Sequence, residues 1–317
     1  MRSSESKEKL SGVLETYKKN VPASTSAIAL NLIKRKFCDA IEYKGIADGT
    51  RGMVLFFGAL LLFCAVYADY LFIGGQIGSK KFSWFQFILT IFLVAITNTI
   101  AIYFFLKSIR IELFRPIDEP IIFDRKNRKI YRLSREVKVG WKGLLAGWPI
   151  QVAVHDWDLV KAEHHVAINA DGSTLNRMHA LVFSVKKSPS DNTIIDSFML
   201  GNGTQHGEST VPAVYEHVRK FMEEGGPHLP PSENISLIGT PSSFLQCMAQ
   251  SGPYGKTLKS WWKNARFLTI LGFVFFPITI PIFTLLGIFS WLSYVTSTPI
   301  QWPSEVLSAI GKPTNED

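Results

Sequence analysis

The chain has 317 residues, of which 47% are hydrophobic, and a formal net charge of +8. This composition excludes an ordinary water-soluble protein, because the apolar residues are concentrated in blocks of the length that membrane-spanning segments require. The positive charge does not indicate nucleic-acid binding. Most basic residues flank the apolar blocks, as Arg51, Lys107 and Arg266 do, and there they favour contact with anionic lipid.

Residues 1–52 are polar and contain two short helical patterns. Apolar residues at three- and four-residue spacing define the first, at Leu10, Val13, Leu14 and Tyr17. Thr25 is a suitable N-cap for the second, which carries Ile28, Leu30, Ile33 and Phe37. We expect two amphipathic cytosolic helices, which lie either on the membrane surface or against the central domain.

Two apolar runs follow, from Met53 to Gly75 and from Trp84 to Leu106. A helix of about 20 residues covers a hydrocarbon core of roughly 30 Å, so each run is long enough to cross a bilayer. The short polar link between them predicts an antiparallel transmembrane hairpin over residues 53–106. Basic residues are frequent on both flanks of the hairpin and scarce in the link, which places the N-terminus and the central domain in the cytosol.

Two polar side chains inside the hairpin, Asp69 and Asn98, form a candidate intramembrane polar site. A carboxylate within a span is a functional candidate by default, although Asp69 lies near the outer end of its run, where contact with the membrane interface also explains it. Asn98 is expected to form a hydrogen bond between helices. When the two runs are aligned from their ends, Asp69 is level with Thr90, so we expect that Asp69 and Asn98 do not pair.

Residues 107–265 are expected to form a cytosolic β-rich domain with helices. Residues 120–133 predict a β-hairpin, because two short apolar strands flank a polar turn. Further strands are predicted at residues 150–154, 180–185 and 193–200. Thr210 is expected to cap a helix that ends at Gly225 and has an apolar stripe at Val211, Val214, Tyr215, Val218, Phe221 and Met222. This order favours a pleckstrin-homology-like β-sandwich with a C-terminal helix, and a small α+β sheet is the alternative.

The last apolar block, residues 266–295, contains Pro277 and Pro281. Its length suits one membrane span kinked at the prolines, which we favour, or a shallow re-entrant hairpin. With a single span, the tail of residues 296–317 lies outside and contains a short interfacial helix that starts at Ser304.

No catalytic, cofactor-binding or metal-binding motif is visible in the sequence. The one cluster with metal-ligand chemistry is His155, Asp156, Asp158, Glu163, His164 and His165. Adjacent histidines in a strand point to opposite faces, so we interpret the cluster as solvated residues at a sheet edge. The three cysteines show neither metal-ligand spacing nor a disulfide framework, which suits the reducing cytosol. We expect no cofactor and no enzymatic activity.

The turn of the predicted β-hairpin carries four basic side chains, Arg125, Lys126, Arg128 and Lys129. If this turn faces the inner leaflet, each side chain contributes about 1 kcal/mol to the binding of anionic lipid headgroups. The alternative is a solvated turn.

The run from Arg115 to Tyr131, together with Trp157-Asp158 and the late Trp302-Pro303-Ser304-Glu305, resembles an uncharacterised family of proteobacterial inner-membrane proteins. The resemblance implies two spans, a cytosolic β-rich domain and a C-terminal apolar block. Genes of this family tend to lie near type VI secretion and toxin–immunity genes, which implies a role in interbacterial competition. No motif in the resemblance specifies a reaction, so no catalytic residue is transferred.

Three hypotheses for the function follow. The favoured one is a non-enzymatic inner-membrane interaction protein, such as an immunity or secretion-accessory factor, that binds a protein partner through its cytosolic domain. The second is a membrane-active toxin or channel component in which Asp69 lines a path through the bilayer. The third is a hydrolase whose site is assembled from scattered residues such as His164 or His179.

Overall fold

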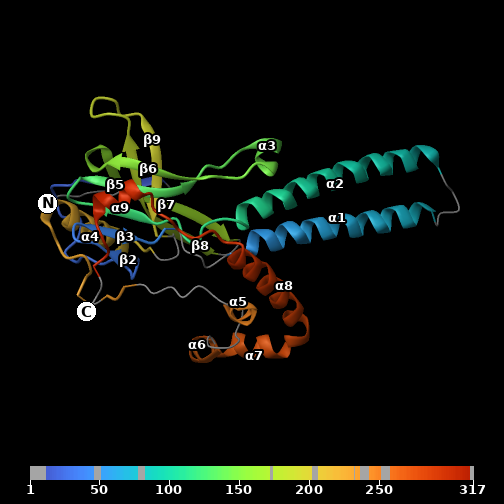
Figure 1. Ribbon diagram of the computed structural model, residues 1–317. Helices are drawn as coiled ribbons and strands as arrows, with labels where there is room; N and C mark the ends of the chain where they lie inside the picture. Colours follow the sequence, from blue (N-terminus) through green and yellow to red (C-terminus); the bar gives the residue numbers. More distant parts are fainter. Residues whose placement is uncertain are drawn as a thin grey trace, which may run out of the picture.

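The computed structural model describes residues 12–45, 51–77, 83–171, 174–201, 206–231, 233–235, 243–250 and 258–314. Figure 1 shows a domain of two β-sheets, from which a long hairpin of two helices projects, and a further group of helices beside the base of that hairpin. The sheet domain, the helical hairpin and the additional helices meet where the hairpin joins the domain.

Two antiparallel sheets form the domain. The four-stranded sheet has the order β1-β7-β8-β9, with β1 at Gly12–Tyr17, β7 at Val160–Asp171, β8 at Thr174–Lys186 and β9 at Ile194–Leu200. The five-stranded sheet has the order β2-β3-β4-β5-β6, with β2 at Ile33–Lys36, β3 at Ala40–Tyr43, β4 at Ile121–Asp124, β5 at Lys129–Arg135 and β6 at Ile150–Asp156. The 3₁₀ turn η1, Trp157–Leu159, connects the two sheets. The strands predicted within the central domain are all confirmed.

One hydrophobic core contains side chains from both sheets and from helix α4, Thr210–Glu224. The predicted stripe of α4 is buried, and Gly225 ends the helix in a left-handed conformation, with φ of 66°. Thr210 is the first residue of the helix and not its cap, since Ser209 occupies the N-cap position. The sheets and α4 therefore form one folding unit.

The expectation of two amphipathic helices in residues 1–52 is wrong for the part of that segment that the structure describes. Residues 12–45 contain β1, β2 and β3 and no helix, and Leu10 lies outside the described residues. The apolar pattern in this segment is too short to distinguish a helix from a strand. A distant pairing of strands decides between them. Tyr17 in β1 contacts His164 in β7, which lies 147 positions later in the chain.

The helical hairpin consists of α1, Met53–Ile77, and α2, Trp84–Glu112. Both helices are long and apolar enough to cross a membrane, as predicted, and α2 continues beyond the predicted end at Leu106. The connection at residues 78–82 lies outside the described residues. A short helix that was not predicted, α3 at Gly140–Leu145, connects β5 to β6 and lies beside the domain end of α2 (Figure 1).

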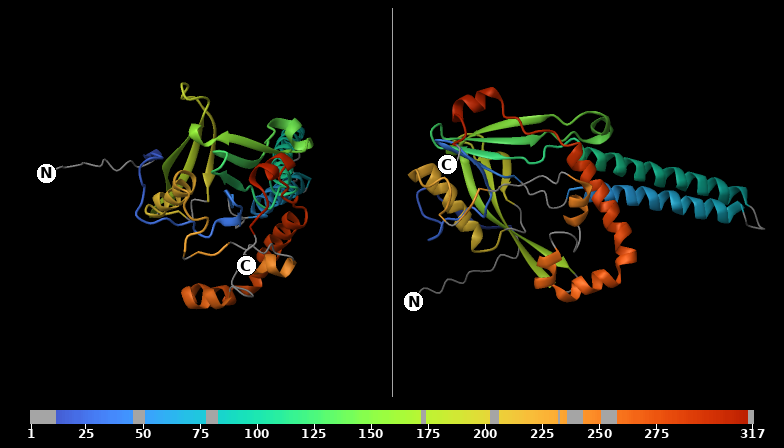
Figure 2. Two further views of the ribbon diagram at one scale, coloured as in Figure 1. Left: turned by 60° about the vertical axis from the view of Figure 1, so that its left-hand side comes forward. Right: turned by 60° about the horizontal axis from the view of Figure 1, so that its bottom comes forward.

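The last apolar block forms two helices, α7 at Arg266–Val274 and α8 at Phe276–Val295. They meet at Phe275, because Pro277 starts a new helix more readily than it continues one. Before them come α5, Phe244–Gln250, and α6, Leu258–Asn264. In Figures 1 and 2, α7 runs crosswise to α8, and neither reaches the distal end of the hairpin.

The C-terminal tail packs on the domain. Helix α9, Ser304–Ile310, starts at the predicted residue, but its apolar side chains are buried against the five-stranded sheet. The contact includes Trp302, Val306 and Ile310 from the tail and Phe37, Ile122, Tyr131 and Leu133 from the sheet. The Thr314 N–H also donates to the Lys36 carbonyl, 2.8 Å away. The expectation that the tail lies on the side opposite to the domain is therefore wrong, since the two are packed together.

Candidate functional site

The ends of α1, α2 and α8 meet at a buried polar junction. Glu112, at the end of α2, is 2% exposed, and its carboxylate accepts hydrogen bonds from the backbone N–H groups of Gly52, at 3.0 Å, and Val54, at 3.2 Å. These amides have no partner within α1, and a negative charge is stabilised at a helix N-terminus. The Ser293 hydroxyl, near the end of α8, donates to the Glu112 backbone carbonyl at 2.9 Å.

Arg51 extends the junction to the sheet domain. Its buried guanidinium donates to the Ser293 hydroxyl, at 3.1 Å, and to the Pro116 carbonyl, at 3.3 Å, just before β4. The same group lies 5.0 Å from the centre of the Tyr294 ring, a cation–π contact. Gly52 is required beside it, because its φ is +85° and a Cβ there would lie 2.4 Å from the Ser290 backbone nitrogen.

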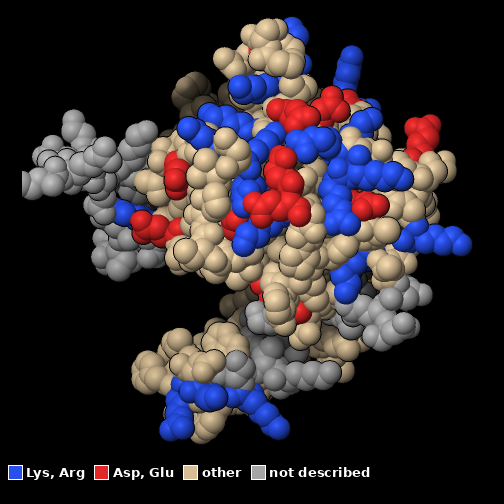
Figure 3. Space-filling model, turned by 90° about the vertical axis from the view of Figure 1, so that its left-hand side faces the viewer, with Lys and Arg blue, Asp and Glu red and all other residues tan. Residues whose placement is uncertain are grey.

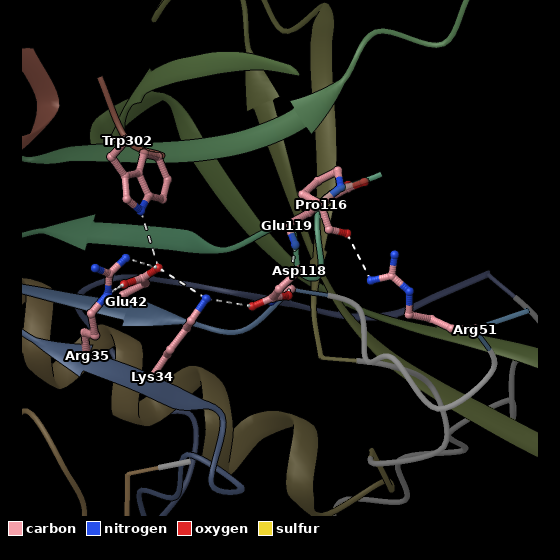
Figure 4. A network of polar contacts seen from close by, with 9 residues as sticks. Lys34, Arg35, Glu42, Arg51, Pro116, Asp118, Glu119 and Trp302 are labelled. Carbon is pink, nitrogen blue, oxygen red and sulfur yellow. Dashed lines mark hydrogen bonds and ion pairs between the residues drawn. The ribbon is translucent and has the colours of Figure 1, made fainter. Parts of the chain in front are cut away.

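Further polar contacts run from the junction into the five-stranded sheet (Figure 4). Asp118 accepts from the Gly45 N–H at 2.8 Å and lies 3.6 Å from the Lys34 ammonium. Burial raises the pKa of Asp118. Lys34 also approaches the fully buried carboxylate of Glu42, which accepts from the Arg35 guanidinium and from the Trp302 indole N–H. This network joins the C-terminal tail to the sheet and ends near the base of the hairpin.

The chemistry of this junction is structural. The carboxylates of Glu42, Glu112 and Asp118 are buried and each accepts hydrogen bonds from donors of the chain itself. Removing any of these donors or acceptors leaves a buried polar group without its partner, which is strongly unfavourable. The arrangement fixes the orientation of the hairpin against the domain.

Asp69 and Asn98 form a hydrogen bond, contrary to the expectation from end alignment. The Asn98 side-chain amide donates to the Asp69 carboxylate and also to the Val94 carbonyl in its own helix. The two runs were aligned from their apolar ends, but α2 continues past Leu106 to Glu112. The contact of Glu112 with the start of α1 sets the alignment of the two helices.

The four basic residues of the β4–β5 turn lie at the end of the domain that carries α4, away from the hairpin (Figure 1). Arg125 forms an ion pair with Asp39, at 2.9 Å, and Arg128 pairs with Asp158, at 2.6 Å, and with Glu223, at 3.2 Å. Lys126 is exposed and Lys129 is half-buried. Figure 3 shows basic and acidic side chains interleaved over this face of the domain. Headgroup contact by these residues stays a prediction.

The histidine cluster is divided between different environments. His164 is buried, with His179 at 2.9 Å and the Tyr17 hydroxyl at 3.4 Å, whereas the adjacent His165 is half-exposed on the opposite face, beside Glu163. Burial, together with His179, lowers the pKa of His164 to about 4. Among the described residues, no group of three or more His, Cys, Asp or Glu side chains is arranged to hold a metal ion.

Two features near the base of the hairpin were not identified from the sequence. The first is the junction, which is indicated by the charged residues just outside the two apolar runs, Arg51 and Glu112. The second is the β5–β6 connection, residues 136–149, where Val137-Lys138-Val139 and Trp141 combine apolar, aromatic and basic side chains as membrane-interface segments do.

Comparison with known proteins shows the family but no function. The model of a family of unknown function, DUF6708, matches residues 98–310. The chain belongs to this family. The match begins within α2 and ends with α9, so it includes Glu112, Pro116 and Ser293 of the junction. No curated protein and no solved structure matches the chain. The expectation that the chain belongs to an uncharacterised family is confirmed.

Proposed function

We propose that this DUF6708 protein is a non-enzymatic interaction protein of the bacterial inner membrane. Its hairpin anchors the two-sheet domain at the cytosolic leaflet, and the domain binds a protein partner. The observation that carries this proposal is the buried junction of Arg51, Glu112 and Ser293, since it holds the domain in one orientation to the hairpin. A flexible linker would suffice for anchoring alone. A fixed orientation suits a domain that must present one surface to a partner.

The C-terminal helices support a re-entrant membrane element. Before this element, the Glu233 carboxylate accepts from the N–H groups of Ala29, Leu30 and Asn31, which attaches the chain to the domain. After it, the Thr298 N–H donates to the Arg115 carbonyl, at 3.2 Å. Both attachments are on the domain, so a full crossing by α8, which has 20 residues and is apolar enough to span a membrane, would require a second crossing in the opposite direction. Helices α5, α6 and α7 have 7, 7 and 9 residues, too few for a second crossing of about 20 residues.

Strand β9 is the surface that we propose for the partner. It ends the four-stranded sheet among the described strands, and its outward side chains include Ile195 and Met199. Part of the backbone edge of β9 is already bonded, since the Ser197 carbonyl accepts from the Arg132 guanidinium and the Leu200 carbonyl contacts the His206 ring. The exposed apolar side chains of the strand are therefore the surface proposed for the partner. Ile195 is 58% exposed, which makes it the best position for a probe.

A photo-crosslinking residue placed at position 195 of the full-length chain tests this surface in native membranes. Val154, exposed on the edge strand β6 of the other sheet, is the matched control position. The proposal expects one discrete crosslinked product at position 195 and none at position 154. It also expects that Ile195→Asp, but not Val154→Asp, abolishes co-purification of that product in mild detergent. The absence of any product at position 195 contradicts the proposal.

The wider setting rests on the resemblance and on topology. The order of the strands, closed by the single helix α4, supports a pleckstrin-homology-like sandwich. The resemblance supports a proteobacterial immunity or type VI secretion-accessory role. A partner identified by crosslinking tests that role directly, because a toxin or secretion component supports it and an unrelated housekeeping protein contradicts it.

A membrane-active toxin or channel component is the second candidate, and one observation favours it. Asp69 lines a groove of about 710 Å³ on the hairpin, together with Cys64, Thr90 and Thr97. Polar side chains within a span commonly mark an ion path. This candidate predicts conductance in planar bilayers that Asp69→Ala abolishes and Thr99→Ala retains. Bilayers that stay silent with the purified chain contradict it.

A further inference from the structure

The β5–β6 connection, residues 136–149, extends beyond the sheet and lies along α2. Three of its apolar side chains are exposed instead of being packed on the domain: Val139 is 88% exposed, and Val137 and Trp141 are each 59% exposed, whereas Leu144 is buried. The basic side chains Lys138 and Lys142 are exposed beside them. Exposure of this loop to water is unfavourable, because water would contact both valine side chains and the indole ring.

Contacts with α2 hold this connection in place. The Trp141 ring packs against the Tyr103 ring, with 5.1 Å between their centres, and the Arg110 guanidinium donates to the Leu144 carbonyl. Arg135, at the end of β5, donates to the carbonyls of Arg110 and Ile111, at 2.8 and 3.2 Å. Its guanidinium also lies 4.9 Å from the centre of the Trp148 ring. The connection is therefore fixed to the last turns of α2.

The level of Tyr103 along α2 decides what surrounds the connection. Tyr103 lies within the apolar run that ends at Leu106, and Lys107 marks the first basic residue after that run. At 1.5 Å per residue, Tyr103 is about 13 Å from the end of α2 at Glu112. The end of the hydrocarbon region next to the domain therefore lies beside Trp141, where tryptophan and lysine are the side chains that a membrane interface favours.

We propose that residues 136–149 form a lipid-binding loop that inserts into the leaflet on the side of the domain. Val137, Val139 and Trp141 contact the boundary between headgroups and acyl chains, and Lys138 and Lys142 bind anionic phosphate groups. This loop is a lipid-contact site distinct from the β4–β5 turn. The proposal requires only that α1 and α2 cross a bilayer and is independent of the proposed protein partner.

Spin labels at single cysteines in the full-length chain test the loop. The background carries Cys38→Ser, Cys64→Ser and Cys247→Ala, and the labelled variant is Val139→Cys. Ile195→Cys on β9 is the matched water-exposed control, and Phe92→Cys on α2, where the native side chain is 60% exposed, is the reference within the bilayer. The chain is reconstituted alone in lipid nanodiscs of phosphatidylethanolamine and phosphatidylglycerol.

Collision rates with oxygen and with a water-soluble nickel complex give the expected result. The label at position 139 collides with the nickel complex several-fold less often than the label at position 195, and its ratio of oxygen to nickel collisions approaches that at position 92. Adding Lys138→Gln and Lys142→Gln raises the nickel collision rate at position 139, because the attraction to phosphate is lost. Equal nickel collision rates at positions 139 and 195 overturn the proposal. Protection at position 139 only in native membranes also overturns it and assigns the loop to a protein partner.

Discussion

The carboxylate of Glu112 accepts a hydrogen bond from the backbone N–H of Gly52 at 3.0 Å, and this contact joins the end of α2 to the start of α1. It aligns the two helices of the hairpin. Because Ser293 of α8 contacts Glu112 and Arg51 contacts the segment before β4, the same contact also orients the domain.

Replacing Glu112 with alanine is expected to lower the free energy of unfolding by about 1–3 kcal/mol, since the buried N–H group of Gly52 and the partly buried N–H group of Val54 lose their acceptor. Tryptophan fluorescence during chemical unfolding in detergent micelles measures the change. Glu15→Ala is the control, because Glu15 is exposed on β1. Equal stability of the two variants would show that the junction contributes nothing.

Gly58→Ala and Gly74→Ala form a matched pair on α1. A Cβ at Gly58 would lie 2.3 Å from the Ser108 hydroxyl and 2.8 Å from its Cβ on α2, whereas a Cβ at Gly74 meets no atom within 4 Å. We expect Gly58→Ala to lower the free energy of unfolding by about 1–3 kcal/mol, because the helices must separate. Gly74→Ala should be neutral or slightly stabilising. Thermal unfolding of both variants in micelles decides this, and the reverse order contradicts the packing of α1 on α2.

The hydrogen bond between Asp69 and Asn98 predicts energetic coupling between the two positions. In a double-mutant cycle with Asp69→Leu and Asn98→Leu, we expect the changes in the free energy of unfolding to be non-additive by about 1 kcal/mol, within the range measured for hydrogen bonds between membrane helices. A second cycle with Asp69→Leu and Thr99→Ala is the control, since Thr99 donates to its own helix. Additive changes in the first cycle would show that Asp69 and Asn98 do not interact.

Stability should decrease at acidic pH because of His164. Burial lowers the pKa of His164 from 6.5 to about 4, so between these values the unfolded chain binds more protons than the folded chain. The contribution of the neutral His164 ring to the free energy of unfolding is therefore fully present above pH 6.5. It decreases by about 1–3 kcal/mol as the pH falls toward 4. Unfolding free energies measured across this interval should vary less with pH in His164→Asn than in the original chain. Equal pH dependence in His164→Asn and in the original chain would contradict this prediction.

Local patterns in the sequence predicted the elements that depend on near neighbours. The β4–β5 hairpin, the stripe of α4 and the start of α9 at Ser304 are set by residues a few positions apart. The N-terminal strands could not be recognised in this way, because β1 forms its sheet with β7, far along the chain. Short apolar spacing fits a helix or a strand equally well until that partner is known.

In the candidate site, too, local patterns identified individual residues but not their distant contacts. Asp69 and Asn98 were both selected from the sequence, yet their pairing depends on Glu112, which lies beyond the apolar run used for the alignment. The position of the tail depends on the burial of Trp302 and Val306 against the sheet, and no local pattern contains that contact. Charged residues immediately outside an apolar run, such as Arg51 and Glu112, are the observation that would have indicated the junction.

Single-cysteine labelling in spheroplasts is the most direct test of the central claim that the hairpin anchors the domain and its tail together on the cytosolic side. Ser308→Cys lies on α9, and Ser83→Cys lies before α2, at the end of the hairpin away from the domain. Both are introduced into the cysteine-free background. We predict that a membrane-impermeant maleimide labels position 83 in intact spheroplasts and position 308 only after permeabilisation. Labelling of position 308 in intact spheroplasts would contradict it.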